Sequence, residues 1–281
     1  MMSRALKMAF WVTFDHVGKL MAVSVLWAIA VGFPGLFAVN AFNSGDRAIM
    51  LLAGVPALVV CTCLTIPVMG VGLAHMVKEF LDTRDGSIRT FFSGIRFYWK
   101  RAIGLGVSYT LVCACLAVSV VFYSVKLRDT VPWLGFGLAA LALWALVLVA
   151  LSALLALPTL VQKKAGVKET VKLSFLLVLD NPLMSVGLGV QVIAISALFA
   201  VITPLMLVLY GGVLAALTGS AYEMLSRKYA YIQATSQDPH ERGGVRPLGI
   251  GRMKPMTYDE MDAQDDYLNR GFRDLLFPWK G

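Results

Sequence analysis

Charged residues are scarce in this chain of 281 residues, since Asp, Glu, Lys and Arg together make up only 15% of it. Soluble domains usually carry about 25% charged residues. Hydrophobic residues fill 58% of the chain, and the mean hydropathy is +0.73. The composition therefore argues against a soluble globular domain and indicates an integral membrane protein.

Cysteine and histidine are also few, with four and three residues respectively. Cys61, Cys63, Cys113 and Cys115 all lie in apolar stretches, which gives no sign of a secreted disulfide framework. Residues two apart on a helix point about 200° apart, so neither Cys-x-Cys pair can chelate a metal by itself. We predict no metal site and no cofactor.

Ionisable residues are missing from the middle of the apolar stretches, which counts against a proton pump or a proton-coupled antiporter. The sequence has no nucleophile elbow, phosphate-binding loop or zinc-protease pattern, so we predict no catalytic residues and no enzyme. The enzyme alternative would rest on His75, Glu79, Asp82 and Asp85, which fall within one short segment. His75 and Glu79 are four apart and would share a helix face. A solvent-facing helix end explains them more simply.

Six long apolar stretches predict an all-α membrane domain over residues 1–228. A span needs about 20 residues to cross about 30 Å of hydrocarbon. The uncharged stretch 182–222 is too long for one span, and Thr203-Pro204 is the natural break in it. One span with a re-entrant segment is the alternative there. The spans are expected near 20–42, 48–77, 102–125, 131–161, 182–202 and 204–225.

Three amphipathic segments, near 4–18, 87–101 and 164–179, precede pairs of spans. In 87–101 aromatic and basic residues fall on opposite sides of a helix, and Gly86-Ser87 is a plausible N-cap. Such helices suit the headgroup layer of a membrane. One in-plane helix followed by two spans, three times over, indicates a threefold repeat, as in some transporters. Shared membrane constraints explain the similarity equally well.

The basic residues are distributed unevenly between the two sides of the predicted bundle. All 25 Lys and Arg residues except Arg47, Lys126 and Arg128 fall on the side of the amphipathic helices and the C-terminal tail. By the positive-inside rule, that side and both termini are cytoplasmic. The basic helices would then attract anionic lipid headgroups, and the positive charge does not indicate nucleic-acid binding.

The C-terminal region, residues 229–281, differs in composition from the membrane domain. We predict a linker over 233–256, a short acidic helix over 257–269 and an aromatic end over 272–280. The aromatic end could dock a partner, such as a transporter or another membrane protein. We favour folding back on the inner face, because opposite charges are already present in the chain, and this would bring the acidic segment 259–266 toward Arg89, Arg96 and Lys168. The residues that would form the docking end are Phe272, Leu275, Leu276, Phe277 and Trp279.

A few polar residues lie within the spans, and Gln191 is the clearest of them. A sugar site could be built from these groups together with Trp27 or Trp144. The commoner explanation is that small polar side chains bridge neighbouring helices. The other members of this predicted polar path are Tyr109, Thr110, Ser152 and Ser196.

Several short motifs resemble the YesL-type family of bacterial multi-pass membrane proteins over about residues 10–228. They are Leu64-Thr65-Ile66-Pro67, Val77-Lys78-Glu79-Phe80, Phe91-Phe92, Phe97-Tyr98-Trp99-Lys100, Leu157-Pro158, Val171-Lys172-Leu173-Ser174-Phe175 and Asp180-Asn181-Pro182. The resemblance implies a polytopic helical protein of the bacterial inner membrane, without an established activity and with a link to sugar import. It carries over no catalytic residues, and the long tail lies outside it.

These observations lead us to expect a transport-associated inner-membrane component, either an accessory subunit or a facilitator, with saccharides as the implied cargo. A membrane scaffold that acts through its cytoplasmic tail is the alternative. A membrane-embedded enzyme is the third and weakest interpretation.

Overall fold

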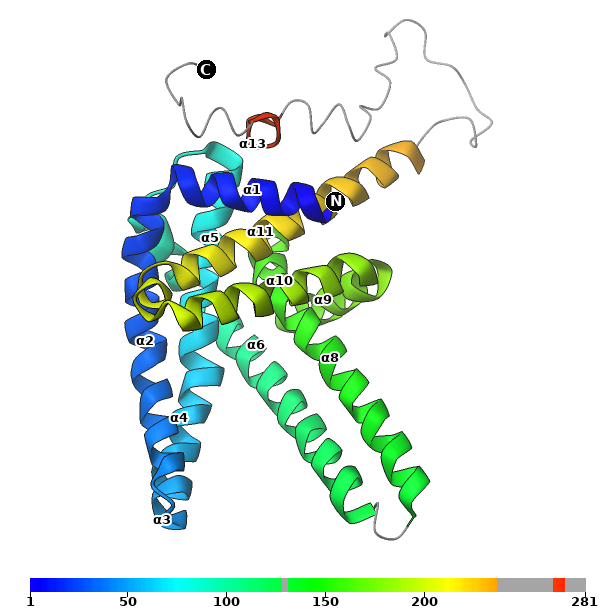
Figure 1. Ribbon diagram of the computed structural model, residues 1–281. Helices are drawn as coiled ribbons and strands as arrows, with labels where there is room; N and C mark the ends of the chain where they lie inside the picture. Colours follow the sequence, from blue (N-terminus) through cyan, green and yellow to red (C-terminus); the bar gives the residue numbers. More distant parts are fainter. Residues whose placement is uncertain (128–130, 237–264, 271–281) are drawn as a thin grey trace, which may run out of the picture.

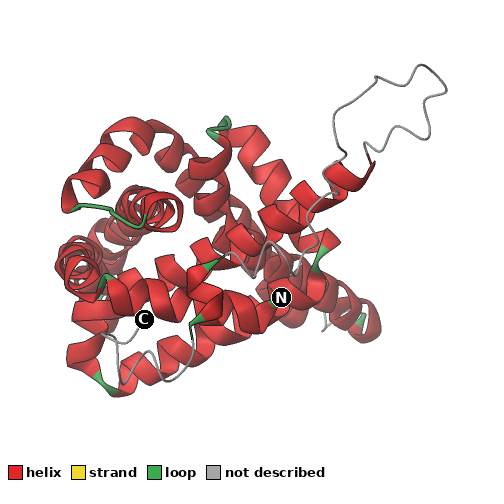
Figure 2. Ribbon diagram, turned by 90° about the horizontal axis from the view of Figure 1, so that it is seen from above, coloured by secondary structure: helices red, strands yellow, loops and turns green. Residues whose placement is uncertain are grey.

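The computed structural model describes residues 1–127, 131–236 and 265–270, and these residues form helices joined by short loops (Figures 1 and 2). Six of the described helices are long and apolar enough to cross a membrane, which confirms the predicted all-α class. They cover Val17–Asn43, Arg47–Thr83, Ile88–Leu127, Pro132–Lys163, Pro182–Val201 and Leu207–Ile232.

The first hairpin follows helix α1 (Met2–Asp15) and begins with α2 (Val17–Asn43). Its returning arm is one continuous helix in which α-helical and π-helical segments alternate. In order, this arm consists of α3 (Arg47–Ile49), the π-helix η1 (Met50–Gly54), α4 (Val55–Val60), the π-helix η2 (Cys61–Thr65) and α5 (Ile66–Thr83).

Two prolines explain the π-helical turns in this arm. Pro56 and Pro67 each lie two residues beyond the end of a π segment. A proline has no N–H and its ring collides with the carbonyl four residues earlier, so the α-helical ladder cannot continue there. The chain instead makes wider bonds, such as the one from the Ile66 N–H to the Cys61 carbonyl, and the arm remains one long helix.

The second hairpin consists of α6 (Ile88–Phe122), the π-helix η3 (Tyr123–Leu127) and α8 (Pro132–Lys163). The sequence predicts an in-plane helix over 87–101 and a separate span over 102–125, and this boundary is absent. Residues 88–122 form one helix because no proline interrupts them, and α5 covers the face that holds Phe91 and Tyr98. Phe91 and Tyr98 therefore pack on a neighbouring helix, whereas Phe92, Phe97 and Trp99 stay exposed. The expected N-cap is confirmed, since Ser87 caps α6.

The third hairpin follows α9 (Val167–Asp180) and consists of α10 (Pro182–Val201) and α11 (Thr203–Ser236). The chain breaks at Asn181 and again at Ile202, as the cap-and-proline pairs predict. Helix α11 continues to Ser236, beyond the expected end of the last span at 225 and into the expected linker, since no Gly or Pro interrupts 213–236 except Gly219. The tail thus leaves the helical body later than predicted.

The third hairpin runs across the first two, which diverge from each other in Figure 1. Along α11, the Gly212 N–H first donates to Ser24 Oγ of α2, at 2.8 Å. Two turns later Gly219 meets α5 so closely that a Cβ would lie 2.8 Å from Val77. One turn further, Tyr222 hydrogen-bonds to α8. Helix α11 therefore crosses three helices at the ends nearest α1, which we call their inner ends.

The main core also lies at the inner end. Helix α1 buries Met8 and Val12 completely, and they pack in one cluster with Leu217 and Leu225 of α11. The same cluster includes Leu20 of α2 and residues of α5. Away from the inner end the first two hairpins have large apolar side chains exposed, among them Phe33, Leu52 and Leu111, which is the surface expected for contact with lipid.

Candidate functional site

A cavity of about 290 Å³ lies where α2, α5, α8 and α11 meet. It occupies the region where the crosswise helix α11 passes over the two diverging hairpins. We call it the central cavity. Its lining consists of Trp27, Ile66, Gly70, Leu73, Ala74, Ala153, Leu154, Leu157, Gly211, Leu214, Ala215 and Thr218.

Glycines bring the walls of the central cavity together. A Cβ at Gly70 of α5 would lie 2.6 Å from the side chain of Leu157 of α8. A Cβ at Gly211 of α11 would lie 3.1 Å from the indole of Trp27. Small residues allow helices in a membrane to approach closely. Here they let four helices converge around a space bordered by larger apolar side chains.

The described residues that line the central cavity carry no charge, and only two of them have polar side-chain atoms. One is Thr218, whose hydroxyl already donates to the Leu214 carbonyl at 2.9 Å. The other is Trp27, whose indole packs beside the ring of Tyr210 at a centroid distance of 5.8 Å. A site of this kind suits an apolar molecule or chain.

Three hydroxyls near the second hairpin form a separate polar cluster. The hydroxyls of Tyr109 on α6 and Ser174 on α9 lie 2.9 Å apart. Ser152 on α8 donates to the same tyrosine oxygen at 3.2 Å. The predicted residues Tyr109 and Ser152 are therefore brought together, and Ser174 joins them although the sequence prediction of the polar path did not include it. These bonds tie three helices to one another.

The remaining residues of the predicted polar path are dispersed. Ser196 pairs with Tyr210 at 2.8 Å, within the third hairpin. Trp144 is 69% exposed on the outer surface of α8. The Oε1 atom of Gln191 is buried and has no hydrogen-bond partner among the described residues. Thr110 is half-buried on α6. None of these four residues lines the central cavity.

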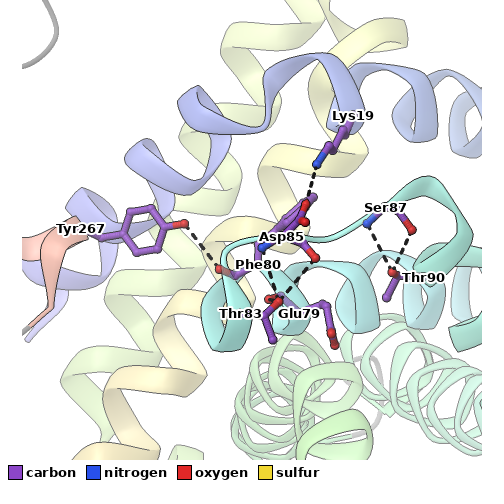
Figure 3. Close-up of polar contacts among 8 residues, drawn as sticks. All are labelled: Lys19, Glu79, Phe80, Thr83, Asp85, Ser87, Thr90 and Tyr267. Carbon is purple, nitrogen blue, oxygen red and sulfur yellow. Dashed lines mark hydrogen bonds and ion pairs between the residues drawn. The ribbon is translucent and has the colours of Figure 1, made fainter. Parts of the chain in front are cut away.

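Phe80 is the centre of a second site at the inner end, which we call the inner junction (Figure 3). Phe80 is completely buried, and the imidazole of His16 stacks on its ring at 3.9 Å. A Cβ at Gly86 would lie 2.6 Å from the ring, so only glycine fits there without movement. The Arg84 N–H donates to the Phe80 carbonyl, and Arg84 has a positive φ of 59° that closes α5.

The tail segment 265–270 docks on the inner junction. The hydroxyl of Tyr267, which is buried, donates to the Phe80 carbonyl at 3.4 Å, as Figure 3 shows. Asp265 accepts from Arg227 of α11 at 2.6 Å, and Arg270 forms an ion pair with Asp15 of α1. This part of the tail therefore folds back on the chain's own inner end.

The expected partners of the acidic tail segment were wrong. This holds for Asp265 alone, which pairs with Arg227 and not with Arg89, Arg96 or Lys168, because the docked segment lies over α1 and the end of α5. The acidic residues Asp259, Glu260 and Asp262, like most of the predicted helix 257–269, lie outside the described residues, and only α13 (Asp266–Asn269) is seen. The predicted docking residues Phe272, Leu275, Leu276, Phe277 and Trp279 also lie outside the described residues.

The ionisable residues of the inner junction do not converge on one point. Asp85 pairs with Lys19 at 3.3 Å rather than with His75, which packs against Gly94 of α6. Burial lowers the pKa of His16, and the positive charge of Lys19 lowers it further, so both disfavour the charged form of the stacked imidazole. Within the described residues no group of three or more His, Cys, Asp and Glu side chains could hold a metal.

Comparison of the chain with protein-family models, with curated proteins and with solved structures found no match. The functional argument therefore rests on the geometry of the central cavity and the inner junction.

Proposed function

We propose that this multi-pass membrane protein is a transport-associated component, either an accessory subunit or a facilitator, that binds an apolar molecule or chain in the central cavity. The observation that carries the proposal is the uncharged cavity of about 290 Å³ where four helices meet. Ligand sites between helices are mostly apolar and contain few polar groups.

Saccharide cargo is the alternative, and the resemblance to the YesL-type family is what supports it. A sugar presents many hydroxyls, which need hydrogen-bond partners when they leave water. The central cavity offers mainly the indole N–H of Trp27 for that purpose. The hydroxyls of Tyr109, Ser152 and Ser174 are already bonded to one another. The geometry thus favours apolar cargo over sugar.

A scaffold role is the second candidate, and the docked segment 265–270 favours it. The ion pairs to Arg227 and Asp15 fix the segment to the inner end, against α1 and α11. In this version the protein holds a membrane partner on that side. Both versions place the chain in a bacterial inner membrane with both termini cytoplasmic, as the distribution of basic residues favours.

Brominated fatty acid should quench the fluorescence of Trp27, because the indole lines the central cavity. The measurement uses the purified, nanodisc-embedded protein with its other five tryptophans replaced by phenylalanine, since Trp133 and Trp144 are exposed and would be quenched from the bilayer. We expect saturable quenching that Ala153→Phe, which fills the cavity, largely abolishes. Ala140→Phe makes the same change at an exposed position of α8 and should leave the quenching intact. Equal quenching in the variants at positions 153 and 140 would contradict the proposed site.

A further inference from the structure

A second pocket, of about 320 Å³, lies between the inner end of α8, helix α9 and the last turns of α11. We call it the inner-end pocket. It shares no lining residue with the central cavity. Its lining consists of Lys163, Leu173, Leu176, Leu177, Asp180, Tyr222, Ser226, Tyr229 and Ala230.

The inner-end pocket has one cationic and one anionic side chain, each exposed and each on a different helix. Lys163 is the last residue of α8 and Asp180 is the last residue of α9. Asp180 is held in place because its Oδ2 accepts from the Tyr229 hydroxyl at 3.2 Å. That hydroxyl in turn accepts from Asn181 Nδ2 at 2.7 Å. A carboxylate has about four acceptor positions, so this bond leaves Asp180 able to bind a ligand cation.

The wall that α9 contributes with its leucines is apolar and continues onto the surface that faces lipid. Leu176 lines the pocket and is 43% exposed. Leu179 and Leu183, which follow along the chain, are 49% and 90% exposed. Exposed leucines of this kind are expected to lie against acyl chains in a membrane protein. A ligand in this pocket can therefore have its charged part between α8 and α9 and its hydrocarbon part on the leucines.

We propose that the inner-end pocket binds a phospholipid whose headgroup ends in a primary ammonium. Lys163 binds the phosphate, Asp180 accepts hydrogen bonds from the ammonium, and Leu176 contacts the first part of an acyl chain. A quaternary ammonium has no N–H to donate to Asp180, and a glycerol headgroup carries the same phosphate without a cation to balance the carboxylate. The site does not depend on the proposed function of the central cavity.

Native mass spectrometry of the full chain tests this, with ethanolamine, choline and glycerol phospholipids of identical acyl chains in competition. We expect the ethanolamine lipid to be retained about two- to fivefold more than the choline lipid, as one exposed charge-assisted contact would give. Asp180→Asn keeps an acceptor for Tyr229 and should bring this ratio close to one. Lys163→Gln should weaken all three lipids. Lys168→Gln, on α9 but outside the pocket, and Asp82→Asn should leave the ethanolamine-to-choline ratio unchanged.

Three results would overturn the proposal. The first is equal retention of the ethanolamine and choline lipids by the wild-type protein. The second is an Asp180→Asn variant that keeps the preference. The third is displacement of the lipid by soluble phosphoethanolamine, which would show that the site recognises the free headgroup and not a membrane lipid. Leu176→Trp, which narrows the pocket at its apolar wall, should reduce lipid retention. Leu134→Trp makes the same change at an exposed position of α8 and should not reduce it. With this pair the test does not depend on the folding of a single variant.

Discussion

Replacing Gly106 with alanine is expected to lower the free energy of unfolding by about 2–3 kcal/mol, at the upper end of the range for overpacked cores. Helix α6 crosses the returning arm of the first hairpin at this glycine. A Cβ there would lie 2.4 Å from Pro67 and 2.6 Å from the Cys63 carbonyl oxygen. The carbonyl belongs to the backbone of η2, which the ring of Pro67 already holds in π geometry. Neither neighbour is a flexible side chain that can turn away.

Thermal or denaturant unfolding in detergent measures this effect. Gly137→Ala is the matched control, since a Cβ at that position of α8 meets nothing within 4 Å. The control should be neutral or slightly stabilising, because alanine is the better helix former by about 1 kcal/mol. If Gly106→Ala behaved like the control, α6 would not cross η2 as closely as described.

Replacing Phe80 with alanine should cost about 3–5 kcal/mol, the usual range for a fully buried aromatic residue. The ring lies between the His16 imidazole and Gly86, and Tyr267 covers the carbonyl of the same residue. Its loss removes packing from α1, α5 and the docked tail segment together. We therefore expect a lower melting temperature and faster tryptic cleavage at Arg270, which is paired with Asp15 in the intact protein.

Phe97→Ala is the control for Phe80→Ala, because Phe97 is 67% exposed on α6. It should change the melting temperature little and leave cleavage at Arg270 unchanged. If both variants were equally stable, Phe80 would not be the centre of the inner junction.

Helix positions could be predicted from the sequence because span length and hydropathy are local properties. The breaks at Asn181-Pro182 and Thr203-Pro204 are also local, since a proline is tolerated in the first turn of a helix and not far within it. These elements occur where they were predicted. Helix α11 ends later than predicted. Charged and polar residues, which mark the end of a span in the sequence, already occur within the last turns of this helix.

What covers an amphipathic face could not be predicted, because the hydrophobic pattern is the same for a headgroup layer and for another helix. The face containing Phe91 and Tyr98 packs on α5, so α6 continues without a break. The central cavity was missed for a similar reason. Its walls are close because of Gly70 and Gly211, and single glycines in an apolar stretch do not indicate which helix approaches them.

Charge attraction predicted that the acidic tail would fold back, but it does not specify a partner. Asp265 and Arg227 are 38 residues apart and meet only because α11 extends past the membrane core to the inner end. Their pairing depends on the crosswise direction of the third hairpin, which neither hydropathy nor helix length determines.

The orientation of the three hairpins is tested most directly by labelling single cysteines from outside intact cells, in a variant whose four native cysteines are replaced by serine. The central cavity exists only because the third hairpin lies across the inner ends of the first two. We expect a membrane-impermeant reagent to label cysteines at Ser44 and Lys126, the outer tips of the first two hairpins, and not at Asp82. A cysteine at Ile202, the tip of the third hairpin, should also remain unlabelled, because this hairpin lies across the inner ends although its helices are long enough to span. This expectation departs from the sequence prediction, in which 182–202 and 204–225 both cross the membrane. Labelling at Ile202 as strong as at Ser44, or labelling of Asp82 alone, would contradict the account.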